Sequence, residues 1–119
     1  MKFTEQLDRA ERANHSLLCV GLDPEPAKFP GDWQGDARRI FDFCAAIVDA
    51  TQDLVLAFKP QIAYFAANRA EDALERLIAH IHRVAPEVPV ILDAKRGDMG
   101  SSAEQIGRAS CRERVCLAV

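Results

Sequence analysis

Acidic and basic side chains alternate over a short stretch near residue 95. Asp93, Lys95 and Asp98 follow a run of mostly aliphatic residues, 88–92. Side chains two residues apart in a strand point to the same face, so Asp93 and Lys95 are expected to project together from the carboxyl end of a buried strand. Buried charges are costly unless they pair. The stretch therefore predicts either a strand that ends in a chemical site or a solvated charged turn.

Two earlier apolar runs also end at charged residues. Residues 17–22 lead to Asp23, and residues 54–58 lead to Lys59, and a proline follows each charge directly. We expect both runs to be buried strands, with a third strand over 90–95. Single charged residues at these positions also have ordinary explanations, because lysine can extend along a strand end to reach water and aspartate before proline favours a turn.

Amphipathic helices are expected between these strands. Residues 36–51 and 69–85 each place their apolar side chains on one helical stripe. Residues 4–13 contain many good helix formers, with Thr4 as the expected N-cap. A further helix is expected after Met99. The segment 25–35, rich in proline and glycine, is expected to be a loop whose length hints at function.

Strands that alternate with helices predict an α/β fold with a parallel sheet and helical crossovers. An open doubly wound sheet and a (β/α)8 TIM barrel both satisfy this order, and in each the site collects at the carboxyl ends of the strands. Three charged strand ends in succession favour the barrel, which brings them around one centre. Three strands cannot close a barrel, which needs about 200 residues or more.

Composition narrows the class of protein. The chain has 119 residues, 49% of them hydrophobic, which is enough for one globular domain. A net charge of -3 argues against nucleic acid or an anionic membrane surface as the main partner. No apolar run is long enough to span a bilayer, and the N-terminus lacks the apolar core of a signal peptide, so we expect a cytoplasmic protein.

Cysteine and histidine spacing does not predict a metal site. The four cysteines are scattered and lack paired metal-ligand spacing: Cys19, Cys44, Cys111 and Cys116. Cys19 and Cys44 are expected to be small, reduced core residues. The three histidines lie among charged residues at the edges of expected helices, where we expect them to be solvated: His15, His80 and His82.

Three motifs, in order and spacing, resemble orotidine 5′-phosphate decarboxylase. They are Leu18–Pro24 (LCVGLDP), Ala57–Gln61 (AFKPQ) and Asp93–Ser101 (DAKRGDMGS), and the resemblance is closest to the bacterial branch that reads DAKRGD. It extends from the N-terminus to about residue 105. The resemblance implies a (β/α)8 barrel that converts orotidine 5′-phosphate to uridine 5′-phosphate in pyrimidine biosynthesis, with no metal and no organic cofactor.

The resemblance also assigns site residues. Asp93, Lys95 and Asp98 form the D-x-K-x-x-D motif, Lys59 completes a network of acids and bases, and Asp23 contacts the ribose. It further implies a homodimer, in which Asp98 serves the neighbouring subunit's site. Loss of carbon dioxide leaves negative charge on a ring carbon, so a fixed cation such as Lys95 can stabilise that charge and deliver the proton. Anionic neighbours raise the pKa of a lysine and so keep Lys95 protonated.

Other functions stay open at this point. Hexulose-phosphate synthases of the same superfamily share the D-x-K-x-x-D motif but use magnesium, although the contexts of Asp23 and Lys59 favour the nucleotide decarboxylase. An open-sheet binding domain is a third possibility. A non-catalytic product is a fourth, because a partial barrel leaves exposed strand edges.

The end of the chain departs from the family. Residues 106–115 read IGRASCRERV, which is what a common sequencing adaptor encodes when it is translated. We therefore expect residues 1–105 to be the N-terminal part of a decarboxylase barrel and residues 106–119 to be a non-native tail. Phosphate-binding loops of such barrels follow strands seven and eight, which have no counterpart here, so the 119-residue chain is expected to be inactive alone.

Overall fold

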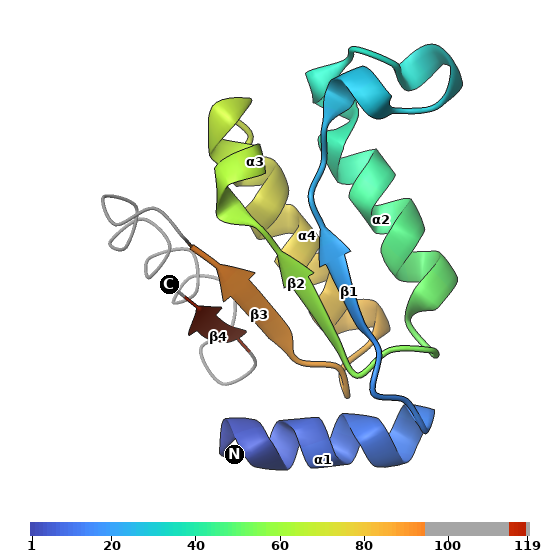
Figure 1. Cartoon of the computed structure of the whole chain (residues 1–119), viewed down its shortest axis with the longest axis vertical. Helices are drawn as coiled ribbons and strands as arrows, with labels where there is room; N and C mark the ends of the chain where they lie inside the picture. Colours follow the sequence, from blue (N-terminus) through green and yellow to red (C-terminus); the bar gives the residue numbers. More distant parts are fainter. Residues whose placement is uncertain (95–114, 119) are drawn as a thin grey trace.

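A parallel sheet runs through the chain, which the computed structural model describes at residues 1–94 and 115–118 (Figure 1). Its strands lie side by side in sequence order. They are β1 (Cys19–Leu22), β2 (Ala57–Pro60), β3 (Val90–Asp93) and β4 (Val115–Ala118). Every neighbouring pair is parallel, which confirms the predicted α/β architecture.

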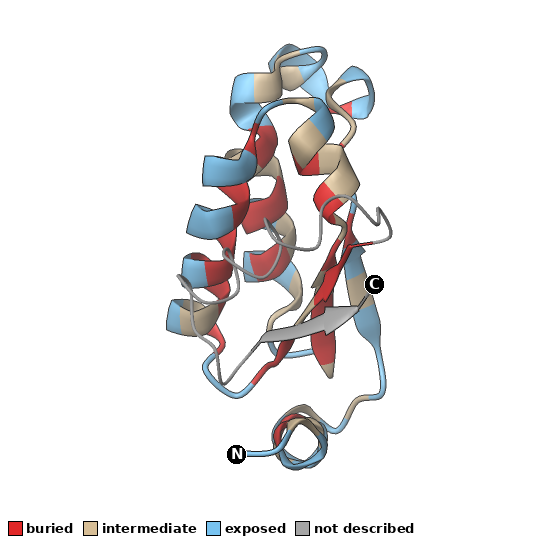
Figure 2. Ribbon diagram, turned by 90° about the vertical axis from the view of Figure 1, so that its left-hand side faces the viewer, coloured by how far each residue is buried: buried red, intermediate tan, exposed pale blue. Residues whose placement is uncertain are grey.

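Helices connect the first three strands. The α-helices are α1 (Phe3–Asn14), α2 (Ile40–Thr51), α3 (Ile62–Ala67) and α4 (Glu71–Val84). Figure 2 shows α2 and α4 on one side of the sheet, with their buried faces turned toward it, and α1 end-on below the strands. The crossovers therefore cover one face of the sheet, while α1 lies at the amino ends of the strands (Figure 1).

The core lies between the sheet and its two long helices. Helix α4 contributes residues at the spacing of one helical stripe, all fully buried: Leu74, Leu77, Ile78 and Ile81. Strand residues that face this layer are also at most 1% exposed: Leu22, Phe58, Val90 and Leu92. Burial of each large aliphatic side chain contributes about 1.5–3 kcal/mol, so this layer is the main source of stability in the described part.

Strand β2 begins three residues later than its apolar run predicted. Residues 54–56 precede the strand, and the side chain of Asn14, the last residue of α1, hydrogen-bonds to the backbone of this segment. The Asn14 side-chain amide donates to the carbonyl oxygens of Gln52 (3.1 Å) and Val55 (2.8 Å). This contact joins residues far apart in sequence, so no local pattern could reveal it. Leu54, in the same segment, is 56% exposed.

Helix α1 also differs in its first residues. It begins at Phe3 with Lys2, not Thr4, as the N-cap. The Glu5 carboxylate accepts a hydrogen bond from the Lys2 backbone N–H at 3.0 Å. A carboxylate in the first turn thus accepts from a backbone N–H at the start of the helix, where the Thr4 hydroxyl was expected to cap it.

The long loop after β1 is folded into short turns of 3-10 helix. They are Pro26–Lys28, Gly31–Trp33 and Ala37–Arg39. Phe29 is 3% exposed and stacks on Phe43 of α2, with ring centroids 4.4 Å apart. The Arg39 guanidinium lies 5.6 Å from the centre of the Trp33 ring. The loop is therefore fastened to the helix that follows it.

A fourth strand lies within residues 106–119, the segment that we expected to be a non-native tail outside the fold. Strand β4 pairs with β3 in the register Val90↔Val115 to Asp93↔Ala118. The expected count of three strands is therefore one short for the described residues. The boundary at residue 105 stays a prediction, and the helix expected after Met99 lies outside the described residues.

Two side-chain expectations were wrong and two were confirmed. Cys19 is exposed because it lies on the open face of an edge strand, whereas Cys44 is buried as predicted. His80 is only 9% exposed, because α2 packs over it, while His15 is exposed as expected. Within the described ranges, the helices are too short or too polar to cross a membrane.

Candidate active site

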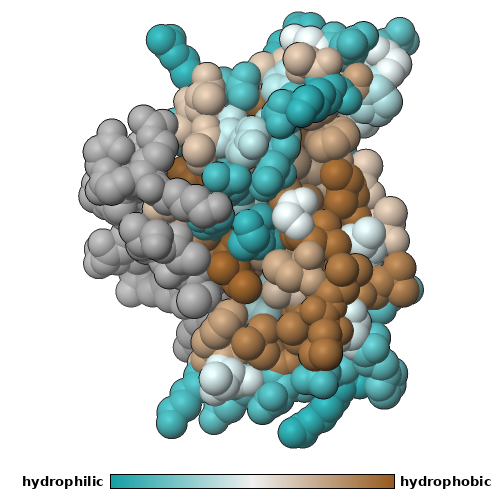
Figure 3. Space-filling model, in the orientation of Figure 1, coloured by the Kyte–Doolittle hydropathy of each residue, from teal (hydrophilic) through white to brown (hydrophobic). Residues whose placement is uncertain are grey.

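The face of the sheet that α2 and α4 leave open carries polar side chains at its carboxyl end. Along β1 and β2 the side chains alternate, so that Leu22 and Phe58 enter the core while Asp23 and Lys59 lie on the other face. Figure 3 shows hydrophilic side chains near the middle and top of this face and hydrophobic ones gathered at its lower right. The carboxyl end is therefore the polar end.

Lys59 and Asp93 form an ion pair on this face. The Lys59 ammonium donates to Asp93 Oδ2 at 3.3 Å, across the two neighbouring strands. The Asp93 side chain is only 6% exposed, whereas that of Lys59 is 35% exposed. Because a buried carboxylate is costly without a partner, this pair stabilises a charge that the fold holds away from water.

The register brings Asp23 to the same level of the sheet. Leu22 of β1 pairs with Pro60 of β2, and Gln61 forms an isolated bridge with Asp93. Extending the β1 register by one residue places Asp23 opposite Gln61. Asp23, Gln61 and Asp93 therefore form one row across three strands, with the Lys59 side chain reaching up to it from the level below.

The residue beside Lys59 on β1 is Gly21. A methyl group at this position would meet only Asp23 Oδ1, at the ordinary contact distance of 3.8 Å. The absence of a side chain thus leaves space next to the Lys59 stem. The motifs found in the sequence include Gly21 and Gln61, but neither was assigned a role in the site, although each lies two residues from a predicted site residue.

Two cysteines report the electrostatics on either side of the sheet. Cys19 is exposed to solvent, but partial desolvation by neighbouring atoms raises the pKa of its thiol, and the nearby positive charge of Lys59 opposes part of that rise. Burial raises the pKa of the Cys44 thiol to about 12, and the negative charge of Asp23 adds to it.

Lys95 and Asp98, the other two members of the predicted motif, lie outside the described residues. Of the predicted site, the structure brings together Lys59 and Asp93 and places Asp23 in the same row. Among the described residues no group of three or more histidine, cysteine or acidic side chains could hold a metal ion.

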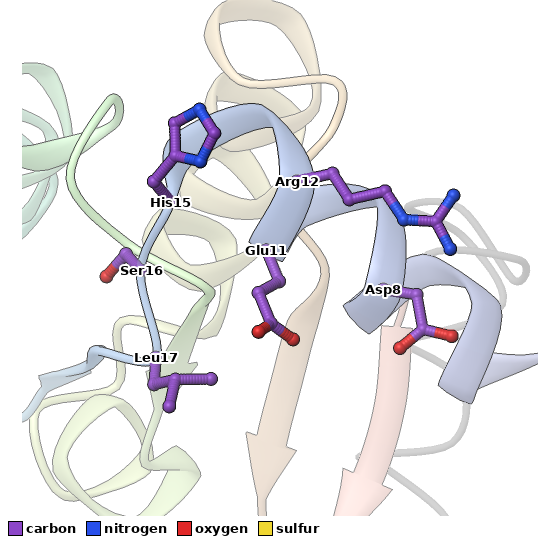
Figure 4. A pocket seen from close by; sticks show the side chains of 6 residues that line it. All are labelled: Asp8, Glu11, Arg12, His15, Ser16 and Leu17. Carbon is purple, nitrogen blue, oxygen red and sulfur yellow. The ribbon is translucent and has the colours of Figure 1, made fainter.

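A separate surface cavity of about 570 Å³ lies at the other end of the strands (Figure 4). Its lining comes from α1 and the segment that leads into β1: Asp8, Glu11, Arg12, His15, Ser16 and Leu17. It contains no residue of the predicted site. The ion pair at the carboxyl ends, rather than this cavity, is therefore the candidate active site.

Comparison with known proteins places the chain. The sequence profile of the Orotidine 5′-phosphate decarboxylase / HUMPS family matches residues 16–114. The chain belongs to this family. Members are similar to it over the whole of the described site, which includes β1, β2 and β3. The fold is therefore part of a (β/α)8 barrel, as the sequence predicted.

Individual relatives agree. A protein from Leptothrix cholodnii named orotidine 5′-phosphate decarboxylase is 77% identical over 108 residues, and one of the same name from Polaromonas naphthalenivorans is 76% identical over 105. These matches cover 91% and 88% of this chain. The chain spans only 38% and 37% of the length of these two relatives.

A solved structure shows the same arrangement of elements. A crystal structure described as an orotidine-monophosphate-decarboxylase from Toxoplasma gondii superposes with a TM-score of 0.72 at 36% sequence identity. The match covers 95% of this chain and 40% of that protein. The candidate site thus belongs to a family whose members extend well beyond the elements described for this chain.

Proposed function

We propose that this chain supplies the catalytic strands of an orotidine 5′-phosphate decarboxylase, a carboxy-lyase of pyrimidine biosynthesis. The observation that carries the proposal is the Lys59–Asp93 ion pair, which lies at the carboxyl ends of parallel strands in a member of this family. Active sites of (β/α)8 barrels lie at this end.

The chemistry requires a cation beside the reacting carbon. The bond between the pyrimidine ring and its carboxylate breaks, carbon dioxide leaves, and the electron pair stays on the ring carbon. The Lys95 ammonium then donates its proton to that carbon, which gives uridine 5′-phosphate. Asp93 lies near the leaving carboxylate, and Lys59 balances the acids and holds a sugar hydroxyl.

The remaining parts of the proposal concern substrate and subunits. Asp23 contacts the ribose, and Asp98 completes the site of the neighbouring subunit in a homodimer. The reaction needs no metal and no organic cofactor. The enzyme works in the cytoplasm, with neither nucleic acid nor membrane as a partner, which suits a net charge of -3.

The test is a hybrid enzyme in which residues 1–105 of this chain are followed by the remaining part of the Leptothrix cholodnii relative. We expect the hybrid to decarboxylate orotidine 5′-phosphate in the presence of EDTA. Its Lys95→Ala variant is expected to lose about 1,000-fold or more in kcat, because it lacks both the fixed cation and the proton donor. The 119-residue chain alone is expected to show no measurable turnover.

Two results would contradict the proposal. An inactive hybrid that folds cooperatively would exclude decarboxylation by these strands. Activity that EDTA abolishes would favour a magnesium-dependent aldolase of the hexulose-phosphate synthase type, which the family also includes. Separately, the DNA that encodes residues 106–119 tests the non-native tail, since ordinary codons in place of adaptor sequence would reject it.

A further inference from the structure

The side chain of Gln61 lies in the site row without an assigned role. Its bridge to Asp93 and the register of β1 place it between Asp93 and Asp23. Phe58 and Pro60 alternate with Lys59 and Gln61 along the chain, and the first two are buried whereas the last two are half-buried. Gln61 therefore shares the open face with Lys59.

Gln61 is hydrogen-bonded to the rest of the fold through its backbone and not through its side chain. Its N–H donates to the Leu22 carbonyl oxygen at 3.3 Å, and its carbonyl oxygen accepts from the Tyr64 N–H at 3.2 Å. Gln61 is the N-cap residue of α3, but its side chain makes no capping hydrogen bond. Within residues 1–94 the Gln61 side chain makes no hydrogen bond or ion pair, so its amide is available to a ligand.

Charge selects the group that such an amide can bind. Asp23 and Asp93 flank Gln61 in the row, so an anionic group of a ligand is disfavoured there, while Lys59 already pairs with Asp93. A hydroxyl suits the position because it donates to a carboxylate while it accepts from an amide N–H. The amide offers both a donor and an acceptor without adding charge.

We infer that Gln61 positions the substrate through a ribose hydroxyl, which accepts from Gln61 Nε2 and donates to the Asp23 carboxylate. The inference rests on the proposed decarboxylase function and adds a contact to it. Gln61 takes no part in the bond-breaking step. Its loss should therefore weaken binding of substrate and product more than it slows the reaction.

The hybrid enzyme provides the test. We expect Gln61→Ala to raise KM for orotidine 5′-phosphate, and the Kd for uridine 5′-phosphate by calorimetry, by about 10-fold, while kcat changes less than about threefold. The matched control is Gln52→Ala, at the far end of the sheet, where the backbone carbonyl accepts from Asn14 and the side chain makes no hydrogen bond among the described residues. It should leave all three constants unchanged.

Substrates that lack one hydroxyl show whether the contact is direct. The two test substrates are 2′-deoxyorotidine 5′-phosphate and 3′-deoxyorotidine 5′-phosphate. With one of them the effect of Gln61→Ala on KM should disappear, because that substrate lacks the hydroxyl that Gln61 binds, and with the other the effect should remain. An unchanged KM in Gln61→Ala, or an equal rise with both deoxy substrates, would overturn the inference while leaving an active, EDTA-resistant hybrid as support for the proposed function. A hybrid that neither turns over nor binds uridine 5′-phosphate would reject both.

Discussion

The two faces of the sheet are built from the same strands but are completed in different ways. On one face Leu22, Phe58 and Leu92 are covered by α2 and α4, which lie within the same stretch of chain. On the other face Lys59 and Asp93 meet each other, and the rest of the barrel lies in the part of the relatives that this chain does not match. The first face determines stability, whereas the second is expected to determine chemistry.

The largest effect should come from the site face. Lys59→Ala in the hybrid enzyme is expected to lower kcat/KM by about 100- to 10,000-fold, since it removes a cation from the site and leaves Asp93 without this partner. The free energy of unfolding should fall by only about 1–2 kcal/mol, because Lys59 is partly exposed. Steady-state kinetics and urea unfolding measure the two effects.

A matched lysine separates the site from general charge effects. Lys28 pairs with Glu25 at 3.0 Å, but its side chain is 75% exposed. Lys28→Ala should therefore leave kcat/KM unchanged and alter stability by about 0.5 kcal/mol or less. Equal losses of activity in the two variants would remove the distinction between the two faces.

The core face should show the reverse pattern. Leu77→Ala removes a fully buried side chain of α4 and is expected to lower the free energy of unfolding by about 2–5 kcal/mol. The kcat of the molecules that remain folded should change little, because Leu77 lies on the side of the sheet away from Lys59. Thermal or urea unfolding, together with kcat per folded molecule, checks both parts.

Leu54 is the control for that change. It is 56% exposed, so Leu54→Ala should lower the free energy of unfolding by much less than Leu77→Ala does. Should the two substitutions cost the same in the hybrid, the remainder of the barrel must cover the residues that precede β2.

The two faces also differ in how far the sequence could predict them. Periodicity identified the α4 stripe, because side chains such as Leu74 and Ile81 meet the core through local geometry alone. The strand ends at Asp23 and Lys59 were predictable for the same reason, since each charge follows an apolar run. The hydrogen bond from the Asn14 side chain to the Val55 carbonyl oxygen was not, because it joins residues far apart in sequence.

Register accounts for what was missed at the site. Gln61 became a candidate only when its bridge to Asp93 showed that it shares a row with two carboxylates. Alternation predicts which face a residue occupies, but not which residue of the next strand lies beside it. Roles that depend on neighbours therefore needed the structure.

His80 tests the polar part of the helix layer. Its Nε2 lies 2.7 Å from Asp49 Oδ1 on α2, and Arg83 Nη2 lies 2.7 Å from its Nδ1. Since arginine only donates, Nδ1 is the acceptor and Nε2 carries the proton that it donates to Asp49. His80→Ala should lower the free energy of unfolding by about 1–3 kcal/mol, as measured in urea.

His15→Ala is the comparison for His80, because His15 is exposed. It should cost less than His80→Ala, although its left-handed backbone (φ 49°) adds some strain to any residue with a side chain. If His15→Ala proved the more destabilising of the two, the inter-helix contact would contribute nothing beyond a surface residue.

The smallest expected effect compares the two cysteines, one on each face. Burial raises the pKa of Cys44 to about 12 from an ordinary 9.0, so the folded state keeps its proton where the unfolded state loses it. The stability that this proton provides is complete below about pH 9 and is lost as the pH rises toward 12, by about 1 kcal/mol at pH 10. Cys44→Ala should therefore flatten the fall in unfolding free energy between about pH 8 and pH 10.

Cys19 lies on the open face, where Lys59 opposes the rise in its pKa, so Cys19→Ala should leave a steeper slope than Cys44→Ala. If unfolding free energy fell equally steeply with pH in the two variants, both thiols would be equally shielded from water, and the two faces would not differ in this respect.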